Sequence, residues 1–504
     1  MITAPMVSPP TVETILGKQR REFSLVRLVR TVKQMPIRFL LISSALLIPC
    51  FWQSHIAAGD LASHAYNAWL VQLIKQGTAS GLWIAPISTN VLFDFMLDFL
   101  TPVIGIEAAQ RLVVGIVVLL FFWAAFALIS AITKKLPWSV TPVLAILAYG
   151  TVFNMGLFNY YLGGALSLAA VAILWEPTLG DGVVAVVVFA LAWLAQPLPV
   201  LWGVAILAYI FLARTVPQKF QLILPAVCIV ALLLARHIIL SHWFATWDWR
   251  QAMHATGADQ GYMFGSHYRL TTLAIAGVWM AALLHLARDR GWIGLIRSIP
   301  FQVYFLCVLG CFLLPYTILF PWYKAAFGGI AERVAWLSAV FVCALVAEAK
   351  YGARYGLVLG AVAILFFSFL YFDTRAINRL EQKVNTLVST LPQNQRVIGE
   401  LRYPPSSGFD ESMLLDRACI GKCFSFGNYE AATEQFRVRA RPGNSIVAWA
   451  KESSTQSRAS GQAQQFFSSQ PEATLYFIYP CRNQVTDVCM ECLTQGSRLP
   501  EGSF

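Results

Sequence analysis

The stretch VVGIVVLLFFWAAFALISAI, residues 113–132, decides the class of protein to which this chain belongs. It contains no charged residue, and it is as long as the roughly 20 apolar residues that a helix needs to cross the core of a bilayer. The rest of the chain is similar, because 57% of its 504 residues are hydrophobic and only 12% are charged. Soluble domains are about 25% charged. We therefore predict a polytopic α-helical membrane protein.

Further apolar runs predict about eleven transmembrane helices in all. They lie at about 39–53, 107–133, 139–156, 162–176, 182–195, 198–213, 220–237, 270–287, 300–317, 334–348 and 355–371. The first run follows a long basic segment, so it is expected to be an uncleaved signal anchor. Short alternating segments, which are typical of a transmembrane β-barrel, are not the pattern of these runs.

The net charge of +11 is explained by the loops on one side of the membrane. Lys and Arg gather in cytoplasmic loops, and residues 1–38 are rich in both. The basic positions that follow alternate crossings are Lys134, Lys135, Arg214, Lys219, Arg288, Arg290, Arg297, Lys350 and Arg354. We therefore expect a cytoplasmic N-terminus, an extracytoplasmic C-terminus and a bacterial inner membrane, with no nucleic-acid partner because no basic–aromatic motif is present.

Three regions follow from this topology. Residues 1–38 form a basic cytoplasmic segment, residues 39–371 form the transmembrane part with a first outside loop at about 55–106, and residues 372–504 form a small α+β extracytoplasmic domain. Within that domain, ATLYFIYP (473–480) predicts a strand. Its cysteines are Cys419, Cys423, Cys481, Cys489 and Cys492. Disulfides persist on the outer side of a membrane, so disulfides are one expectation for these cysteines. The alternative is that the cysteines of CIGKC and CMEC bind zinc.

The first outside loop begins with SHIAAGDLASHAYNAWLVQLIKQG, residues 54–77. Asp60 precedes a predicted helix over 61–76, and the spacing places Asp60, His64 and Asn67 on one face. The other positions are mostly apolar, which predicts a helix lying on the membrane surface. Asp60 is either the N-cap of this helix or, if its face looks into a cleft, a general base.

A second polar stripe lies in TNVLFDFMLDFL, residues 89–100. Asn90, Asp94 and Asp98 are spaced four residues apart on a helix that is otherwise apolar. Ionisable groups next to a membrane are rare and indicate function. The stripe either faces water, or lines the same cleft as Asp60, or supplies carboxylates to a divalent cation. No other cofactor is indicated, since the sequence has no P-loop for ATP.

The arrangement resembles the GT-C superfamily of membrane glycosyltransferases. The resemblance rests on the acidic Asp60 just after the first helix, surface helices in the first outside loop, about eleven crossings and an extracytoplasmic C-terminal domain. GDLASHAYNAWL (59–70) looks like a phrase in uncharacterised bacterial members. The resemblance implies a polyprenyl-phosphate-linked sugar donor, an acceptor that it does not identify, and Asp60 as the base. Gly59 stands where some members have a second acidic residue.

Such a transfer needs donors or cations for the developing phosphate charge. Three outside loops supply them: FNYYLGG (158–164), MFGSHYR (263–269) and PWYKAAFGGIAER (321–333). The side chains that we expect to bind substrate there are Tyr160, His267, Arg269, Tyr323, Lys324 and Arg333. The alternatives are that Tyr160 belongs to the interfacial aromatic belt, that Arg269 extends to the interface, and that Arg333 has a structural role.

Two other classes of function stay open at this point. A lipid or solute transporter or flippase needs internal repeats or charges at mid-membrane, and no clear repeat is seen. A non-catalytic scaffold explains the C-terminal domain but not Asp60 and His64. The charges gather at one face, where a lipid-linked donor and an outside acceptor can meet, so the sequence favours a glycosyltransferase.

Overall fold

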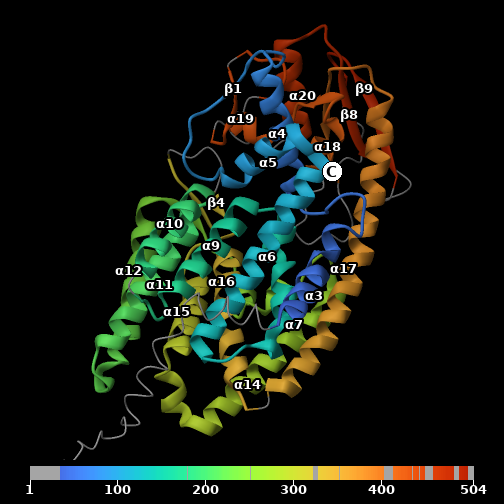
Figure 1. Ribbon diagram of the computed structural model, residues 1–504. Coiled ribbons are helices and arrows are strands. Elements are labelled where there is room, and N and C mark those ends of the chain that lie inside the picture. The colour runs from blue at the N-terminus through green and yellow to red at the C-terminus, as the bar shows by residue number, and fades with distance from the viewer. Residues whose placement is uncertain are drawn as a thin grey trace, which may run out of the picture.

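The computed structural model describes most of the chain as a bundle of helices with a smaller domain at one end. The described residues are 35–178, 180–249, 251–321, 327–350, 352–401, 413–433, 435–441, 443–448, 458–481 and 487–497. Figure 1 shows the bundle below and the C-terminal segments, in orange and red, at the top. We call the end of the bundle that carries these segments the domain-side end.

Among the described residues, six helices are long and apolar enough to cross a membrane. They are α6 (Ile106–Thr133), α11 (Pro197–Thr215), α12 (Ile223–His242), α14 (Arg269–Ile296), α16 (Ile330–Glu348) and α17 (Gly352–Ser389). In α12 no residue is buried, although the helix is strongly apolar. An apolar surface of this size is not stable in water, so the prediction of an α-helical membrane protein is confirmed.

Shorter apolar helices occupy the other predicted crossings. They are α3 (Pro36–Leu47) with η1 (Ile48–Cys50), η2 (Trp138–Val140) with α7 (Thr141–Ala148) and α8 (Thr151–Asn154), α9 (Phe158–Leu174), α10 (Asp181–Ala195) and α15 (Ile299–Leu313). Each is shorter than the roughly 20 residues of a full span. The number of eleven crossings therefore stays a prediction.

Local sequence explains where these helices stop. Between α10 and α11, Gln196 is extended and Pro197 occupies the first turn of the next helix, where its missing N–H costs nothing. The side chain of Gln196 then accepts a hydrogen bond from the N–H of Leu198, at 3.4 Å. In α14, Gly291 has a φ of 73°, and the helix is kinked there.

Short elements connect the helices. Strands β2 (Phe244–Thr246), β3 (Thr317–Leu319) and β4 (Phe327–Gly328) form an antiparallel sheet. The remaining turns of helix in the bundle are η3 (Gln218–Phe220), α13 (Gln251–His254), η4 (Ala258–Gly261) and η5 (Ser266–Tyr268).

The segment 55–106, predicted to be the first outside loop, contains α4 (Leu61–Lys75), β1 (Leu82–Ile84) and α5 (Leu92–Ile104). The predicted helix over 61–76 is confirmed, but its predicted position on the membrane surface is wrong. Its residues from Leu61 to Ala68 are all buried, because C-terminal segments cover it. The hydroxyl of Tyr66, for instance, accepts a hydrogen bond from the N–H of Ser425, at 3.0 Å.

The C-terminal segments form a mixed sheet. Its strands are β5 (Gln395–Gly399), β6 (Cys423–Ser425), β8 (Leu475–Pro480) and β9 (Val488–Leu493), in the order β6-β5-β8-β9. The first three are parallel and β9 is antiparallel to β8, so the strand predicted over 473–480 is confirmed. The helices beside it are α18 (Met413–Cys419), α19 (Tyr429–Thr433) and α20 (Arg458–Ser469).

Disulfides join four of the five cysteines for which they were predicted, Cys419 with Cys423 and Cys481 with Cys489. Cys492 is an exposed free thiol. The zinc alternative is therefore wrong for these four cysteines, because their sulfurs are bonded to each other.

The last helix differs from the prediction. The run 355–371 was expected to end at the membrane surface, yet α17 continues without a break to Ser389 and carries the chain into the C-terminal sheet. The first loop also joins this region through β1, which pairs antiparallel with β7 (Val438–Ala440). The segment 55–106 and the C-terminal segments are thus packed into one structure at the domain-side end.

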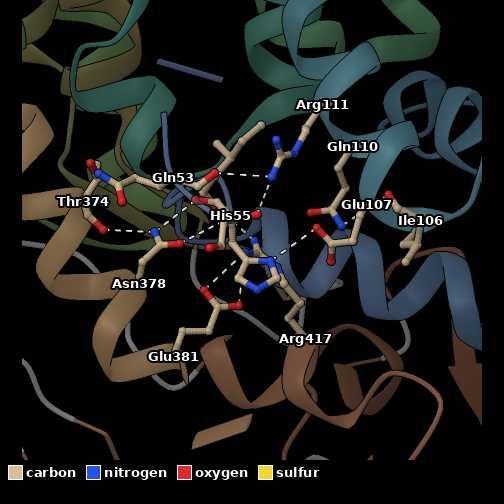
Figure 2. A network of polar contacts seen from close by, with 12 residues as sticks. Gln53, His55, Ile106, Glu107, Gln110, Arg111, Thr374, Asn378, Glu381 and Arg417 are labelled. Atoms are coloured by element: carbon tan, nitrogen blue, oxygen red, sulfur yellow. Dashed lines mark hydrogen bonds and ion pairs between the residues drawn. The ribbon is translucent and has the colours of Figure 1, made fainter. Parts of the chain in front are cut away.

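A polar network fastens this structure to the helices, and we call it the loop–helix tie (Figure 2). Asn378 on α17 accepts a hydrogen bond from the N–H of His55, at 2.8 Å, and donates one to the His55 carbonyl, at 3.0 Å. The buried guanidinium of Arg417 pairs with the buried carboxylate of Glu381 and donates to the carbonyl of Ile56, at 3.2 Å. Arg111 on α6 binds the carbonyls of residues 53 and 54.

Candidate functional site

Backbone contacts at the end of α8 position Asp60. The N–H of Gly59 donates to the carbonyl of Asn154, at 2.8 Å, and the N–H of Asp60 donates to that of Met155, at 3.2 Å. Gly156 has a φ of 77°, and a Cβ at that position would lie 2.2 Å from the Asp60 nitrogen. Only glycine allows this approach, so the two glycines fix where Asp60 stands.

Asp60 precedes α4 but does not cap it. Its backbone is already in the right-handed helical region, and its side chain makes no capping hydrogen bond. The carboxylate instead accepts a hydrogen bond from the hydroxyl of Tyr429 on α19. Burial and the neighbouring carboxylates of Asp60 and Glu430 raise the pKa of Tyr429 well above its usual value, so this hydroxyl keeps its proton. The capping alternative for Asp60 is therefore wrong.

His64 lies one turn further along α4, between two acidic side chains. Its Nδ1 is 2.7 Å from Oδ1 of Asp94 and 3.8 Å from Oε1 of Glu430. Burial disfavours the charged imidazole, but the carboxylates of Asp94, Glu430 and Asp60 outweigh burial and raise the pKa of His64 to about 9. His64 is thus a buried cation at neutral pH.

Glu430 is the uncommon member of this group. Burial raises its pKa to about 8, and the carboxylates of Asp94 and Asp60 act in the same direction against the lowering effect of His64. Its Oε1 is buried without a hydrogen-bond partner. A carboxyl group that is protonated at pH 7 beside ionised ones is typical of sites that move protons. We call Asp60, His64, Asp94, Tyr429 and Glu430 the Asp60 cluster.

Asp94 joins this cluster to α9. Its Oδ2 accepts a hydrogen bond from Nδ2 of Asn159, at 2.9 Å, and Oδ1 of Asn159 accepts one from the N–H of Phe93, at 3.0 Å. Asn159 therefore fixes the first turn of α5 as well as the carboxylate. Asn90 lies outside the helix with a φ of 58°, so the predicted stripe of three residues is reduced to Asp94 and Asp98.

Asp98 does not face the Asp60 cluster. It forms an ion pair with Arg437, whose guanidinium lies 4.6 Å from the centroid of the Phe95 ring. Burial raises the pKa of Asp98 to about 6, although Arg437 opposes this. Asp98 therefore attaches α5 to the C-terminal segments, and its expected place in the cleft is not seen.

Asn67 lies beside the cluster in a second polar group. It donates to the carbonyl of Ser63, at 2.9 Å, and to its hydroxyl, at 3.2 Å. Nδ2 of Asn428 contacts the same hydroxyl, at 3.1 Å, and Oδ2 of Asp416, at 2.9 Å. A cavity of about 30 Å³ lies between Asp416 and Tyr429, enough for one water molecule.

Arg333 lies in the first turn of α16 and contacts Tyr160 on α9. Its guanidinium lies 5.4 Å from the ring centroid of Tyr160, and the hydroxyl of Tyr160 donates to the Arg333 carbonyl, at 2.8 Å. A Cβ on Gly329 would lie 3.5 Å from the Met155 side chain and 3.9 Å from Nε of Arg333. Gly329 therefore lies near the Met155 side chain, and the Met155 carbonyl accepts the hydrogen bond from the N–H of Asp60.

A second acidic and histidine group lies next to Arg333. Nδ1 of His254 is 2.8 Å from Oδ2 of Asp259, and its Nε2 is 3.5 Å from Oε1 of Glu332. Although burial opposes it, these two carboxylates raise the pKa of His254. Glu332 therefore pairs with His254 and leaves Arg333 to face Tyr160.

The other expected binding residues are not brought to the cluster by the described contacts. Nε2 of His267 is 3.0 Å from Oδ2 of Asp373, which also accepts a hydrogen bond from Tyr268. Arg269 is exposed at the start of α14. Tyr323 and Lys324 lie outside the described residues.

A metal is not suggested by these side chains. Within the described ranges, no group of three or more His, Cys, Asp or Glu residues could hold a metal ion. Asp94 and Asp98, the carboxylates considered for a divalent cation, already pair with His64 and Arg437. A cation bound between these two carboxylates would be repelled by the imidazolium of His64 and the guanidinium of Arg437.

Sequence reasoning did not identify Tyr429, Glu430 or Asp416. They belong to the polar C-terminal part, Asp416 in MLLDRAC (413–419) and the other two in FGNYEAATE (426–434), where no periodicity marks them. A weak signal was present, since an acidic residue next to an aromatic one opens a short helix. Compared with protein-family models, curated proteins and solved structures, the chain matches none.

Proposed function

We propose that this protein is a membrane glycosyltransferase that takes a sugar from a polyprenyl-phosphate carrier, with Asp60 as its general base. In this proposal the chain crosses a bacterial inner membrane about eleven times as a GT-C-like enzyme, with its N-terminus in the cytoplasm. The domain-side end is then the extracytoplasmic face, where donor lipid and acceptor meet.

One observation carries the proposal: the half-buried Asp60 belongs to a mixed acid–base cluster instead of capping its helix. Three separate segments, α4, α5 and α19, contribute to that cluster. Collecting Asp60, Asp94 and Glu430 around one imidazolium is electrostatically costly, since like charges raise one another's pKa. Such an arrangement is a common feature of catalytic sites.

The reaction assigns one task to each group. The acceptor hydroxyl attacks C1 of the sugar and loses its proton to Asp60. The bond from C1 to the phosphate oxygen breaks, the electron pair leaves with the polyprenyl phosphate, and the configuration at C1 inverts. The hydroxyl of Tyr429 orients the base. The imidazolium of His64 limits the negative charge around the base, and we assign Arg333, at the start of α16, to bind the leaving phosphate.

The positions of the ionisable groups favour an enzyme over a transporter. A transporter binds its substrate near the middle of the membrane. The groups around Asp60 and around His254 lie instead at helix starts and in connecting segments. A scaffold without catalytic activity would not need a protonated Glu430 beside Asp60.

The test is sugar transfer by the purified protein, with a panel of polyprenyl-phosphate sugars and membrane acceptors. Asp60→Asn keeps the size of the side chain and can still accept the Tyr429 hydrogen bond, but it cannot take the proton. We expect wild type to transfer one sugar and Asp60→Asn to be slower by about 10²–10⁴-fold, with an unchanged unfolding temperature. Equal rates would show that Asp60 is not the base.

A further inference from the structure

A second site lies on the outside of α17, where a polar groove of about 340 Å³ opens between this helix and residues 53–55. The side chains that line it are all polar and none is acidic. Two of them, Arg375 and Arg379, are exposed and stand one helical turn apart. Two guanidinium groups at this spacing match the oxygens of a phosphate, which arginine binds in a bidentate manner.

The acids near the groove face other partners. Glu381 pairs with Arg417, Asp373 with His267, and Glu107 with His55. Within the part of the chain that the structure describes, no acidic side chain forms an ion pair with Arg375 or Arg379. The groove therefore keeps an excess of positive charge.

The walls of the groove are fixed before any ligand binds. The side chain of Asn378 binds both the N–H and the carbonyl of His55, as Figure 2 shows. The side chain of Gln53 donates to the carbonyl of Tyr371, at 3.4 Å. A rigid polar wall lowers the entropy cost of binding, which distinguishes this groove from two arginines on a mobile surface.

The face of α17 that bears these arginines also faces lipid. Leu357, Ile364 and Phe372 are 78%, 72% and 63% exposed. With 3.6 residues per turn, they share a sector of roughly 80° with Arg375 and Arg379. A lipid whose chains lie along the apolar part of this stripe thus has its headgroup beside the arginines.

The depth is also right for a headgroup. With a rise of 1.5 Å per residue, Arg375 lies about 5 Å beyond Phe372 along the helix axis, and Arg379 lies about 11 Å beyond it. The headgroup layer extends roughly 5–8 Å beyond the hydrocarbon core on each side. With Phe372, the last exposed large apolar residue of this stripe, taken as the edge of the hydrocarbon core, Arg375 falls within that layer. Arg379 can reach back to it, because arginine side chains extend toward the interface.

We propose that this groove binds the phosphate of an anionic membrane phospholipid, as a structural ligand distinct from the sugar-carrying lipid. The segment that leads from the groove to Asp60 passes Ile56, whose carbonyl is held by Arg417. A phosphate in the groove contacts none of the residues of the Asp60 cluster. Bound lipid instead bridges residues 53–55 and α17, and so stabilises the loop–helix tie.

The experiment is thermal unfolding of the full chain in mild detergent, with native mass spectrometry to count bound lipids. Phosphatidylglycerol, phosphatidylcholine and glycerol 3-phosphate are added separately. Wild type is compared with the double variant Arg375→Gln/Arg379→Gln, and with Arg269→Gln as a control that removes an exposed arginine elsewhere. All variants keep a polar side chain on an exposed position, so each is expected to fold.

We expect phosphatidylglycerol to raise the unfolding temperature of wild type by about 3 °C and to be retained as a bound lipid. In the double variant its apparent affinity falls about tenfold, whereas Arg269→Gln behaves as wild type. Three results would each overturn the proposal: equal binding by the double variant, equal effects of phosphatidylcholine, or full stabilisation by glycerol 3-phosphate alone. None of them depends on sugar transfer.

Discussion

The Asp60 cluster and the loop–helix tie are neighbours that use similar residues in opposite ways. In the tie, the buried Arg417 meets the buried Glu381, and Asn378 satisfies both backbone groups of His55. In the cluster, three carboxyl groups surround one imidazole, and Glu430 keeps a buried oxygen without a hydrogen-bond partner.

The difference separates a structural role from a functional one. Opposite charges matched one to one hold two segments together. Carboxyl groups packed close together lower the stability of the fold but raise the pKa of one of them, so that it keeps its proton at neutral pH. Such a group of like charges needs a surrounding structure that holds it in position. The tie provides this structure, because it fixes residues 53–56 just before Asp60.

The largest effect on stability is expected from breaking the tie. Arg417→Met leaves the carboxylate of Glu381 buried without its partner, and such a change costs about 3–5 kcal/mol. We expect a much lower unfolding temperature in detergent. The double variant Arg417→Met/Glu381→Gln removes both charges and should recover part of the loss. If Arg417→Met unfolds like wild type, the pair does not hold the domain-side end together.

The Asp60 cluster should make the stability of the folded protein depend on pH. His64 and Glu430 both hold a proton more tightly in the folded protein than in the unfolded chain, where their pKa values are about 6.5 and about 4.3. The stabilising contribution of His64 is therefore complete below pH 6.5 and is lost as the pH rises through about 9. That of Glu430 is lost as the pH rises through about 8.

The unfolding temperature should therefore fall from about pH 4.3, where the contribution of Glu430 begins to be lost, to about pH 9, and most steeply between about pH 6.5 and about pH 8, where both groups contribute. Each group contributes at most about 1.4 kcal/mol per pH unit to the change in free energy of unfolding. Glu430→Gln keeps the neutral shape and should flatten this decline. A decline of the same slope in Glu430→Gln and in His64→Gln would mean that other groups titrate.

The smallest effect is expected at the boundary between the two regions. Tyr66 on α4 accepts the N–H of Ser425, and Tyr66→Phe leaves that buried donor without a partner, which costs about 1–3 kcal/mol. The measurement is again thermal unfolding, with Tyr476→Phe on the half-buried surface of β8 as a control. An equal shift in both variants would show that the hydrogen bond to Ser425 adds nothing.

Part of this structure was predictable from local sequence. The apolar runs predicted the helices, and the break at Gln196–Pro197 predicted that α10 and α11 are separate helices. The spacing of Asp60 and His64 predicted that they share a face of one helix, and the helix itself begins and ends where expected. These features depend on residues within a few helical turns of each other, so the spacing of apolar and polar residues along the sequence is enough to predict them.

What covers each face was not predictable. Helix α4 is amphipathic in sequence, and such a pattern fits lipid or protein equally well. Only the fold brings Ser425 and Glu430 over it, across more than 350 residues of chain. Helix α17 was expected to end at residue 371 because its second half is polar, and a polar stretch is typical of a loop. The C-terminal sheet that packs beside this half could not be foreseen from local sequence.

The measurement that tests the account most directly is the rate of sugar transfer per folded molecule in Asp60→Asn and Arg417→Met, side by side. We expect Asp60→Asn to unfold at the wild-type temperature and to lose at least about 10²-fold in rate. Arg417→Met should unfold at a lower temperature, and its folded fraction should lose less of the rate than Asp60→Asn does, because it keeps the base and only loosens the segment before it. If Asp60→Asn transfers sugar as fast as wild type, the assignment of Asp60 as the base is contradicted.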